Sequence, residues 1–180
     1  GDRGVVLNTT FTHSRSAHGG SIYINEYSVG TKIHNSSFTS TISDNEGGAI
    51  AWYGDDGEII DVHFKNYYAL HGGALAGSAD NMNIANSTFE YGSTRDTYED
   101  TGGYGCSGVS IHWIGGDNLR VSNSTFYENQ AHANGGFIAA VDCDNALLYN
   151  LSFKGVMALD CGGAIYWANS TNLTIISNEF

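Results

Sequence analysis

The stretch from residue 35 to residue 75 decides the fold, because it contains the same two motifs twice. It reads Asn35-Ser-Ser-Phe38, Gly47-Gly-Ala-Ile50, the degenerate Asp61-Val-His-Phe64 and then Gly72-Gly-Ala-Leu75. The two phenylalanines lie 26 residues apart. A unit this short cannot bury its own apolar face, so its repetition indicates a solenoid in which stacked turns share one core.

The repeat extends in both directions over the whole chain. The phenylalanine recurs at intervals of 27, 26, 25, 37, 27 and 27 residues, at Phe11, Phe38, Phe64, Phe89, Phe126, Phe153 and Phe180. An aliphatic residue precedes each phenylalanine by five positions, at Val6, Ile33, Ile59, Ile84, Val121, Leu148 and Ile175. We therefore expect internal ladders in which phenylalanine stacks on phenylalanine and aliphatic on aliphatic. The odd offset of five requires a corner or bulge between the two columns if both point inward.

Local patterns identify the repeating element as a short strand. Around the glycine pairs the apolar residues alternate, as in Ile22/Ile24 and Ile165/Trp167, which is typical of β-structure. The chain has 24 glycines, which suit tight turns, and no proline, which fits strands whose N–H groups all donate to the next coil. The sequence predicts one all-β domain over residues 1–180, a parallel β-helix of six to seven coils with about 27 residues per coil. The long interval predicts an insertion loop near residues 91–104.

Composition excludes several classes of function. The formal net charge is −12, from 7 Lys and Arg against 19 Asp and Glu, so no basic face for nucleic acid can form. No apolar run approaches the ~20 residues of a membrane-spanning helix. With 41% hydrophobic and 12% aromatic residues, the chain has enough apolar side chain to fill a core rather than remain disordered.

The repeats resemble those of a known group of surface proteins. Gly-Gly-Ala-Ile at residues 47–50 and Asn-Ser-Thr-Phe at residues 86–89 are similar to repeats of bacterial polymorphic outer-membrane proteins and of adhesin-like proteins of methanogenic archaea. The similarity covers residues 4–180, although the Phe-x-x-Asn of the bacterial repeats occurs only once, at residues 126–129. It implies a right-handed parallel β-helix, an extracellular or cell-surface location, and a structural or adhesive role with surface glycans or host proteins as partners.

Seven asparagines begin an Asn-x-Ser/Thr sequon, namely Asn8, Asn35, Asn86, Asn123, Asn150, Asn169 and Asn172. The first five share one repeat position, so they form either a stacked asparagine ladder or a column of N-glycan acceptors. The two copies without asparagine carry His63 and Glu179 where the sequon hydroxyl would be. A ladder does not need that hydroxyl but a glycosylating enzyme does, so we predict N-glycosylation at some of these sites. Acceptors on adjacent coils would be only ~4.8 Å apart, which argues against full occupancy.

Two groups of residues suggest metal binding, each with a simpler alternative. The insertion carries Asp96, Glu99 and Asp100, whose hard oxygen ligands could hold Ca²⁺ or form a solvated acidic loop. His18, Glu46 and His71 precede successive glycine pairs and would form either a transition-metal site or a solvated edge. We expect no other cofactor apart from the glycans.

Catalysis and glycan binding are the alternatives to a structural role. A carbohydrate-active hydrolase or lyase would need paired carboxylates such as Asp55–Asp56 or Asp142–Asp144. No cluster of basic residues accompanies either pair, so we expect the protein not to be an enzyme. A glycan-binding module would instead use an exposed aromatic stripe, drawn from Tyr23, Trp52, Tyr53, Trp113, Tyr166 and Trp167.

The cysteines and the repeat phase bear on assembly. The three cysteines, Cys106, Cys143 and Cys161, leave at least one thiol free, with buried free thiols or one disulfide as the alternatives. Residues 4–11 match residues 173–180 in repeat phase. The partners expected at both ends are therefore either flanking repeats of a longer chain or further copies stacked into a fibre.

Overall fold

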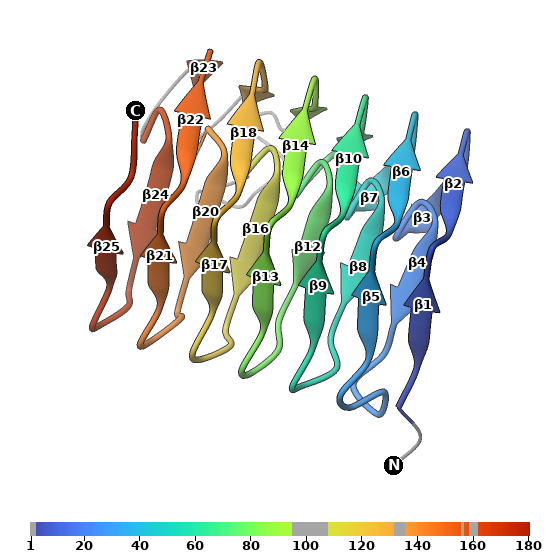
Figure 1. Ribbon diagram of the computed structural model, residues 1–180, viewed down its shortest axis with the longest axis horizontal. Coiled ribbons are helices and arrows are strands. Elements are labelled where there is room, and N and C mark those ends of the chain that lie inside the picture. Colours follow the sequence, from blue (N-terminus) through green and yellow to red (C-terminus); the bar gives the residue numbers. More distant parts are fainter. Residues whose placement is uncertain (1–2, 95–107, 132–135, 156, 159–161) are drawn as a thin grey trace.

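A computed structural model describes residues 3–94, 108–131, 136–155, 157–158 and 162–180. The chain forms a parallel β-solenoid of about six turns with roughly 27 residues per turn, as the repeat predicts. Figure 1 shows successive coils lying side by side along the long axis, and the described residues contain no helix. Within that described part no helix is therefore long or apolar enough to cross a membrane.

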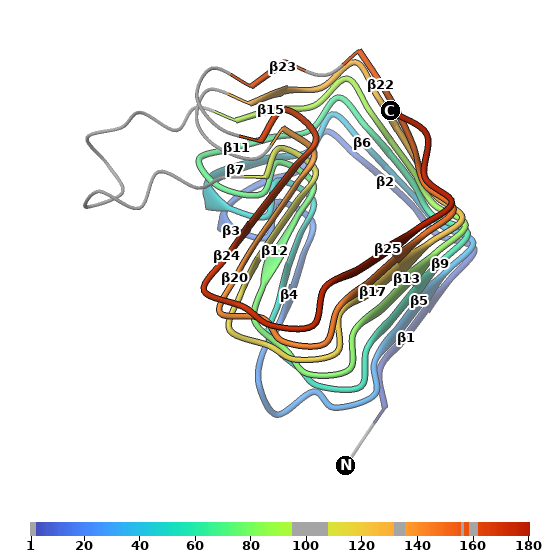
Figure 2. The same ribbon diagram turned by 90° about the vertical axis from the view of Figure 1, so that its left-hand side faces the viewer.

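Four parallel sheets form the walls, and the view down the axis in Figure 2 shows a four-sided cross-section. Sheet A contains β1 (Val5–Leu7), β5 (Lys32–His34), β9 (Glu58–Ile60), β13 (Asn83–Ala85), β17 (Arg120–Ser122), β21 (Leu147–Tyr149) and β25 (Thr174–Ile176). Sheet B contains β2 (Thr10–Thr12), β6 (Ser37–Thr39), β10 (His63–Lys65), β14 (Thr88–Glu90), β18 (Thr125–Tyr127) and β22 (Ser152–Lys154).

The other two walls complete each coil. Sheet C contains β3 (Arg15–His18), β7 (Ile42–Glu46), β11 (Tyr68–Ala69), β15 (Ser93–Thr94), β19 (Gln130–Ala131) and β23 (Met157–Ala158). Sheet D contains β4 (Ile22–Ile24), β8 (Ile50–Trp52), β12 (Leu75–Gly77), β16 (Ile111–Ile114), β20 (Ile138–Val141) and β24 (Ile165–Ala168).

The strands are short because residues with a left-handed backbone end them. At the corner between sheets A and B this residue has φ between 48° and 57° in every coil, at Asn8, Asn35, Asp61, Asn86, Asn123, Asn150 and Ser177. Asparagine and aspartate adopt this conformation more easily than other non-glycine residues. The corner re-aims the chain between Val6 and Phe11, so both of these side chains pack against the core, as their odd spacing requires.

The core is built from ladders of like residues. The seven phenylalanines form one continuous stack, with adjacent ring centroids 4.7–5.2 Å apart and ring planes within 16° of each other. The aliphatic column of sheet A pairs in the same register, from Val6 opposite Ile33 to Leu148 opposite Ile175. Each coil therefore buries apolar area mainly against the coils before and after it.

The glycine pairs are needed because the backbone conformation and the close approach of adjacent coils leave no room for a Cβ atom. Gly47, the first of its pair, has φ of +62°, a region that L side chains rarely adopt. A Cβ on the second glycine, Gly48, would lie 2.0 Å from the carbonyl oxygen of Gly73 on the next coil. The motif thus marks the place where adjacent coils come too close for any side chain.

The structure corrects one expectation and leaves others outside its described part. Trp52 and Trp113 are fully buried and so cannot belong to an exposed aromatic stripe, whereas Tyr23 is 56% exposed and Tyr53, Tyr166 and Trp167 are partly exposed. Cys143 is a buried free thiol, and its burial raises the pKa to about 11. The calcium candidates Asp96, Glu99 and Asp100, and also Cys106 and Cys161, lie outside the described residues.

Candidate functional site

The sequon asparagines lie on the surface at the ends of strands. All seven are exposed, and all seven have positive φ, between 48° and 56°. Five form the column at the corner between sheets A and B. The other two, Asn169 and Asn172, lie in the connection that leads from sheet D to sheet A in the last coil. The local backbone therefore directs each of these asparagines away from the core.

Part of the asparagine column is also a hydrogen-bonded ladder. The Nδ2 of Asn35 donates to Oδ1 of Asn8 at 2.6 Å, and the Nδ2 of Asn150 donates to Oδ1 of Asn123 at 2.9 Å. Neither amide is buried by these contacts, since all four residues remain exposed. The amide groups that form the ladder are therefore the same groups that would carry N-glycans. These hydrogen bonds fit both a structural ladder and a column of glycan acceptors.

At the Asn35 corner the bonds to the backbone are made by the hydroxyl one position before the sequon hydroxyl. The buried hydroxyl of Ser36 donates to the carbonyl of His34 at 2.7 Å and accepts the N–H of Thr9 at 3.1 Å. The sequon hydroxyl of Ser37 instead points from the outer face of β6 and contacts only the hydroxyl of Thr10, at 3.2 Å. The hydroxyl that bonds to the corner backbone thus stands one position after the corner residue, at Ser36, Ser87 and Ser124, while Val62 and Leu151 take that position in two other coils.

A second asparagine ladder at the corner between sheets D and A provides an internal comparison. The Nδ2 of Asn81 donates to Asp56, that of Asn118 donates to Asn81, and that of Asn172 donates to Asn145, at 2.8–2.9 Å. These residues also have left-handed backbones. Asn81, Asn118 and Asn145 are followed at the sequon position by Asn83, Arg120 and Leu147, and only Asn172 in the last coil is followed by a hydroxyl residue, Thr174. A ladder of the same geometry therefore forms without sequon hydroxyls.

Sequence reasoning missed this second ladder together with the aspartate ladder beside it. The Oδ1 of Asp55, Asp80, Asp117 and Asp144 each accepts the backbone N–H one coil further on, at 2.6–3.0 Å. The available signal was the dipeptide Asp-Asn, which recurs at residues 80–81, 117–118 and 144–145. The paired carboxylates Asp55–Asp56 and Asp142–Asp144, considered above as catalytic, thus lie in or beside a structural ladder.

The histidine column brings His18 and His71 to either side of Glu46. The Nδ1 of His18 lies 2.9 Å from Oε1 of Glu46, which also accepts a hydrogen bond from the hydroxyl of Tyr53. His71 pairs with Glu46 through the backbone and packs its ring 5.4 Å from that of His112. Within the described ranges, no three His, Cys, Asp or Glu side chains are arranged to hold a metal ion.

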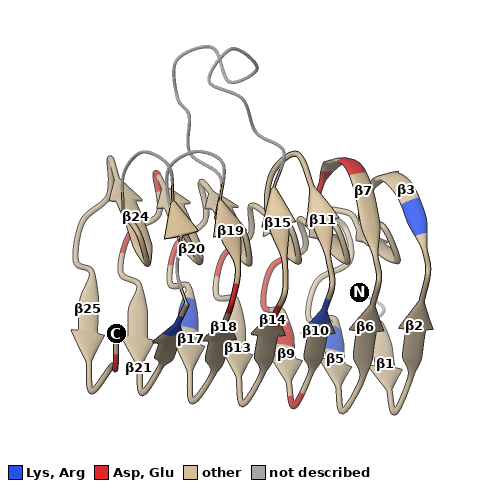
Figure 3. Cartoon of the chain, turned by 90° about the horizontal axis from the view of Figure 1, so that it is seen from above, with Lys and Arg blue, Asp and Glu red and all other residues tan. Residues whose placement is uncertain are grey.

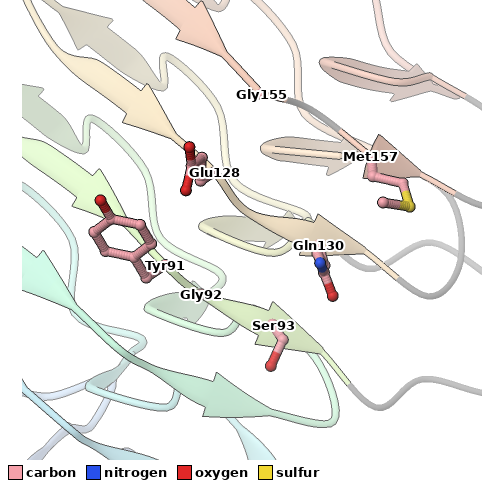
Figure 4. Close-up of a pocket in the computed structure, with 7 residues that line it drawn as sticks. All are labelled: Tyr91, Gly92, Ser93, Glu128, Gln130, Gly155 and Met157. Carbon is pink, nitrogen blue, oxygen red and sulfur yellow. The ribbon is translucent and has the colours of Figure 1, made fainter.

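A groove of about 580 Å³ opens over three coils at the corner between sheets B and C, and Figure 4 shows its lining. One wall is the corner column of Tyr91, Glu128 and Gly155, and the other is the outer face of sheet C, with Ser93, Gln130 and Met157 in adjacent register. Gly155 places no side chain where the preceding coils carry Tyr91 and Glu128, which leaves the groove open at that end.

A buried polar network fixes the floor of this groove. The Oδ1 of Asn129 accepts the N–H of Gly92 at 2.6 Å and the hydroxyl of Tyr67 at 2.9 Å. The Tyr67 ring reaches Asn129 from two coils away by passing Gly92, where a Cβ would lie 1.8 Å from the ring. Burial raises the pKa of Tyr67, so its hydroxyl keeps its proton over the physiological range. Asn129 is the residue of the single Phe-x-x-Asn motif, which therefore has a structural use here.

Charged residues are sparse along the coils, as Figure 3 shows, and in the described part Arg15, Lys32 and Lys65 each pair with a carboxylate. Lys32 and His34 contact Glu58, and Lys65 and His63 contact Glu90. The Lys32 ammonium holds the pKa of Glu58 below its usual value. No protein-family model, curated protein or solved structure matches this chain.

Proposed function

We propose that this chain is a non-enzymatic structural element of an extracellular or cell-surface protein, a rigid β-solenoid stalk that carries N-linked glycans. Its stiffness comes from the continuous ladders of backbone, phenylalanine and amide groups along the axis. Such a rod suits display or adhesion better than a function that needs large internal motion. The resemblance of the repeats to surface adhesin-like proteins agrees with this proposal.

The comparison between the two asparagine ladders carries the proposal. Both ladders use left-handed asparagines with amide hydrogen bonds between coils. In the column between sheets A and B all five asparagines have a hydroxyl residue two positions later, whereas in the other ladder Asn172 alone has one and Asn81, Asn118 and Asn145 have none. Recognition by a glycosylating enzyme explains this difference, while stacking alone does not.

Spacing between coils limits how many sites carry sugar at once. Adjacent coils are ~4.8 Å apart, so a glycan on Asn8 leaves too little room for one on Asn35. In the same way, a glycan on Asn123 excludes one on Asn86 or Asn150. Asp61 interrupts the column between Asn35 and Asn86 and separates the two groups. We therefore expect partial occupancy, with the two groups modified independently.

The enzymatic alternative has less support. Asp55 and Asp144 accept backbone hydrogen bonds from the next coil, and Asp56 accepts one from Asn81. Asp55 and Asp56 are also exposed, without the apolar surroundings typical of a catalytic general acid. Turnover of any of a panel of neutral and acidic polysaccharides by the purified protein would replace the structural proposal with this one.

The assembly partners belong to the same proposal. The outermost strands β1 and β25 of sheet A each have one hydrogen-bonded neighbour. Their free edges can pair with flanking coils, either of the same polypeptide or of another copy. Analysis of the native material by size and mass would distinguish a longer polypeptide from a fibre of separate copies.

Glycosylation is tested by mass measurement on protein expressed in its own host. We expect an intact mass above that of the bare chain, which falls after chemical deglycosylation, and glycopeptides at the corner between sheets A and B. Ser37→Ala removes the Asn35 sequon while keeping Asn35 and its ladder, and Ser37→Thr is the matched control that keeps the sequon. Loss of the Asn35 glycan in the first variant alone supports the proposal. A single mass equal to that of the bare polypeptide in each of the three proteins would reject it.

A further inference from the structure

We propose that the groove formed by Tyr91, Glu128, Gly155, Ser93, Gln130 and Met157 binds a neutral oligosaccharide chain that lies along the solenoid axis. This binding is separate from the structural role and does not depend on glycosylation of the chain. It also differs from the aromatic stripe expected on sheet D, two of whose members are buried.

The aromatic wall of the groove is held in place before any ligand binds. The Tyr91 side chain is 42% exposed, yet the edge-on ring of Tyr127 lies 5.6 Å from it at an interplanar angle of 89°. The Lys65 ammonium lies 5.3 Å from the Tyr91 ring centroid, and the left-handed backbone of Tyr91 fixes where the ring leaves the corner. An exposed tyrosine with a fixed orientation is suited to stacking on the apolar face of a sugar ring at low entropic cost.

Polar groups follow the aromatic ring at the spacing of the coils. Ser93, Gln130 and Met157 lie opposite one another on three successive strands, and Figure 4 shows them in one row. A hydroxyl, an amide and a thioether are thus presented ~4.8 Å apart, a distance close to the length of one sugar ring in an extended chain. The Glu128 carboxylate on the opposite wall can accept hydrogen bonds from sugar hydroxyls.

Charge decides which oligosaccharides fit. None of the seven residues that line the groove is a lysine, arginine or histidine, and Glu128 is an acid. Lys65, whose ammonium lies over the Tyr91 ring, is already bound to Glu90 at 2.9 Å. An anionic sugar would therefore lose hydration without gaining a counter-charge from the residues that line the groove, whereas a neutral one would not. The buried network of Tyr67 and Asn129 keeps the floor rigid, so the groove is largely pre-formed.

The test uses the full chain from a host without N-glycosylation, so that no attached sugar can enter the groove. Saturation-transfer NMR and titration with cellohexaose, mannohexaose and chitohexaose detect binding, and hexagalacturonate is the anionic probe. Tyr91→Ser removes the ring but keeps the backbone, because Ser40 occupies the same corner position with φ of 56°. Tyr91→Phe keeps the ring. Tyr27→Ala, at an exposed tyrosine in another connection, is the control for non-specific effects.

We expect at least one neutral hexasaccharide to bind, about tenfold weaker binding by the serine variant, and little change in the phenylalanine and Tyr27 variants. Circular dichroism and the melting temperature establish that the serine variant is folded. The proposal is overturned if no neutral probe binds at millimolar concentration, if Tyr91→Ser binds as tightly as the parent, or if hexagalacturonate binds better than the neutral sugars.

Discussion

At the scale of single residues, His112 is the clearest case of a polar group placed in an unfavourable position. It is buried between alanines of the neighbouring coils, and its Nε2 has no hydrogen-bond partner among the described residues. Burial, with a smaller contribution from nearby His71, lowers its pKa to about 3. In the folded protein this imidazole therefore stays neutral under mildly acidic conditions that protonate it in the unfolded chain.

The burial of His112 predicts that the folding stability falls at acid pH, and that replacing this histidine removes its part of the fall. Between pH 6.5 and about 3 the unfolded state binds a proton that the folded state does not, so stability is fully present above pH 6.5 and falls as the pH is lowered. We predict that His112→Ala reduces this slope by up to about 1.4 kcal/mol per pH unit. Urea unfolding at pH 7, 6, 5 and 4 measures it, with exposed His13→Ala as the control. Equal slopes for His112→Ala and the parent would contradict the prediction.

The aspartate ladder makes a second prediction at this scale. Asp117 accepts the N–H of Asp144 and donates its own N–H to Asp80, so three carboxylates face solvent on successive coils. Asp117→Asn keeps the accepting oxygen and removes one charge, and we predict that it raises stability by roughly 0.5 kcal/mol at low salt and not at 1 M salt. Asp117→Ala loses the acceptor and lowers stability by about 1 kcal/mol. The prediction fails if chemical denaturation ranks the alanine variant above the asparagine variant.

At the scale of elements, the phenylalanine stack packs the coils of sheet B together on their inner face, beside the backbone pairing of their strands. Phe64 is fully buried between Phe38 and Phe89, with ring centroids at 5.2 and 4.7 Å. We predict that Phe64→Ala destabilises the protein by about 3–5 kcal/mol, because it leaves a cavity that the rigid coils cannot close. Phe180→Ala, at a ring 70% exposed in the last coil, should cost much less. Thermal and urea unfolding measure the stability of both variants. Similar losses of stability for Phe64→Ala and Phe180→Ala would contradict the prediction.

At the scale of the whole molecule, the fold was predictable because like residues stack on like. Fixed columns of phenylalanine, aliphatic residues and glycine pairs leave one arrangement that buries them all. Trp52 and Trp113 could also have been placed, since they share strand parity with the buried Ile50 and Ile111.

The groove could not be predicted from the sequence in the same way. Its corner column contains Tyr91, Glu128 and Gly155, which have no residue type in common, so no repeat pattern indicates it. Its floor depends on a Tyr67 ring that crosses from one coil to another beside Gly92. Three-dimensional juxtaposition of unlike residues, rather than repetition, creates this site.

The most direct test of a glycan-bearing solenoid stalk is a density map of the native protein at side-chain resolution. We predict one inner row of phenylalanine rings and density extending from Nδ2 of some asparagines at the corner between sheets A and B. No such density should extend from Asn81, Asn118 or Asn145 in the other ladder. Bare amides throughout the sequon column, or phenylalanines dispersed among different walls, would contradict the proposal.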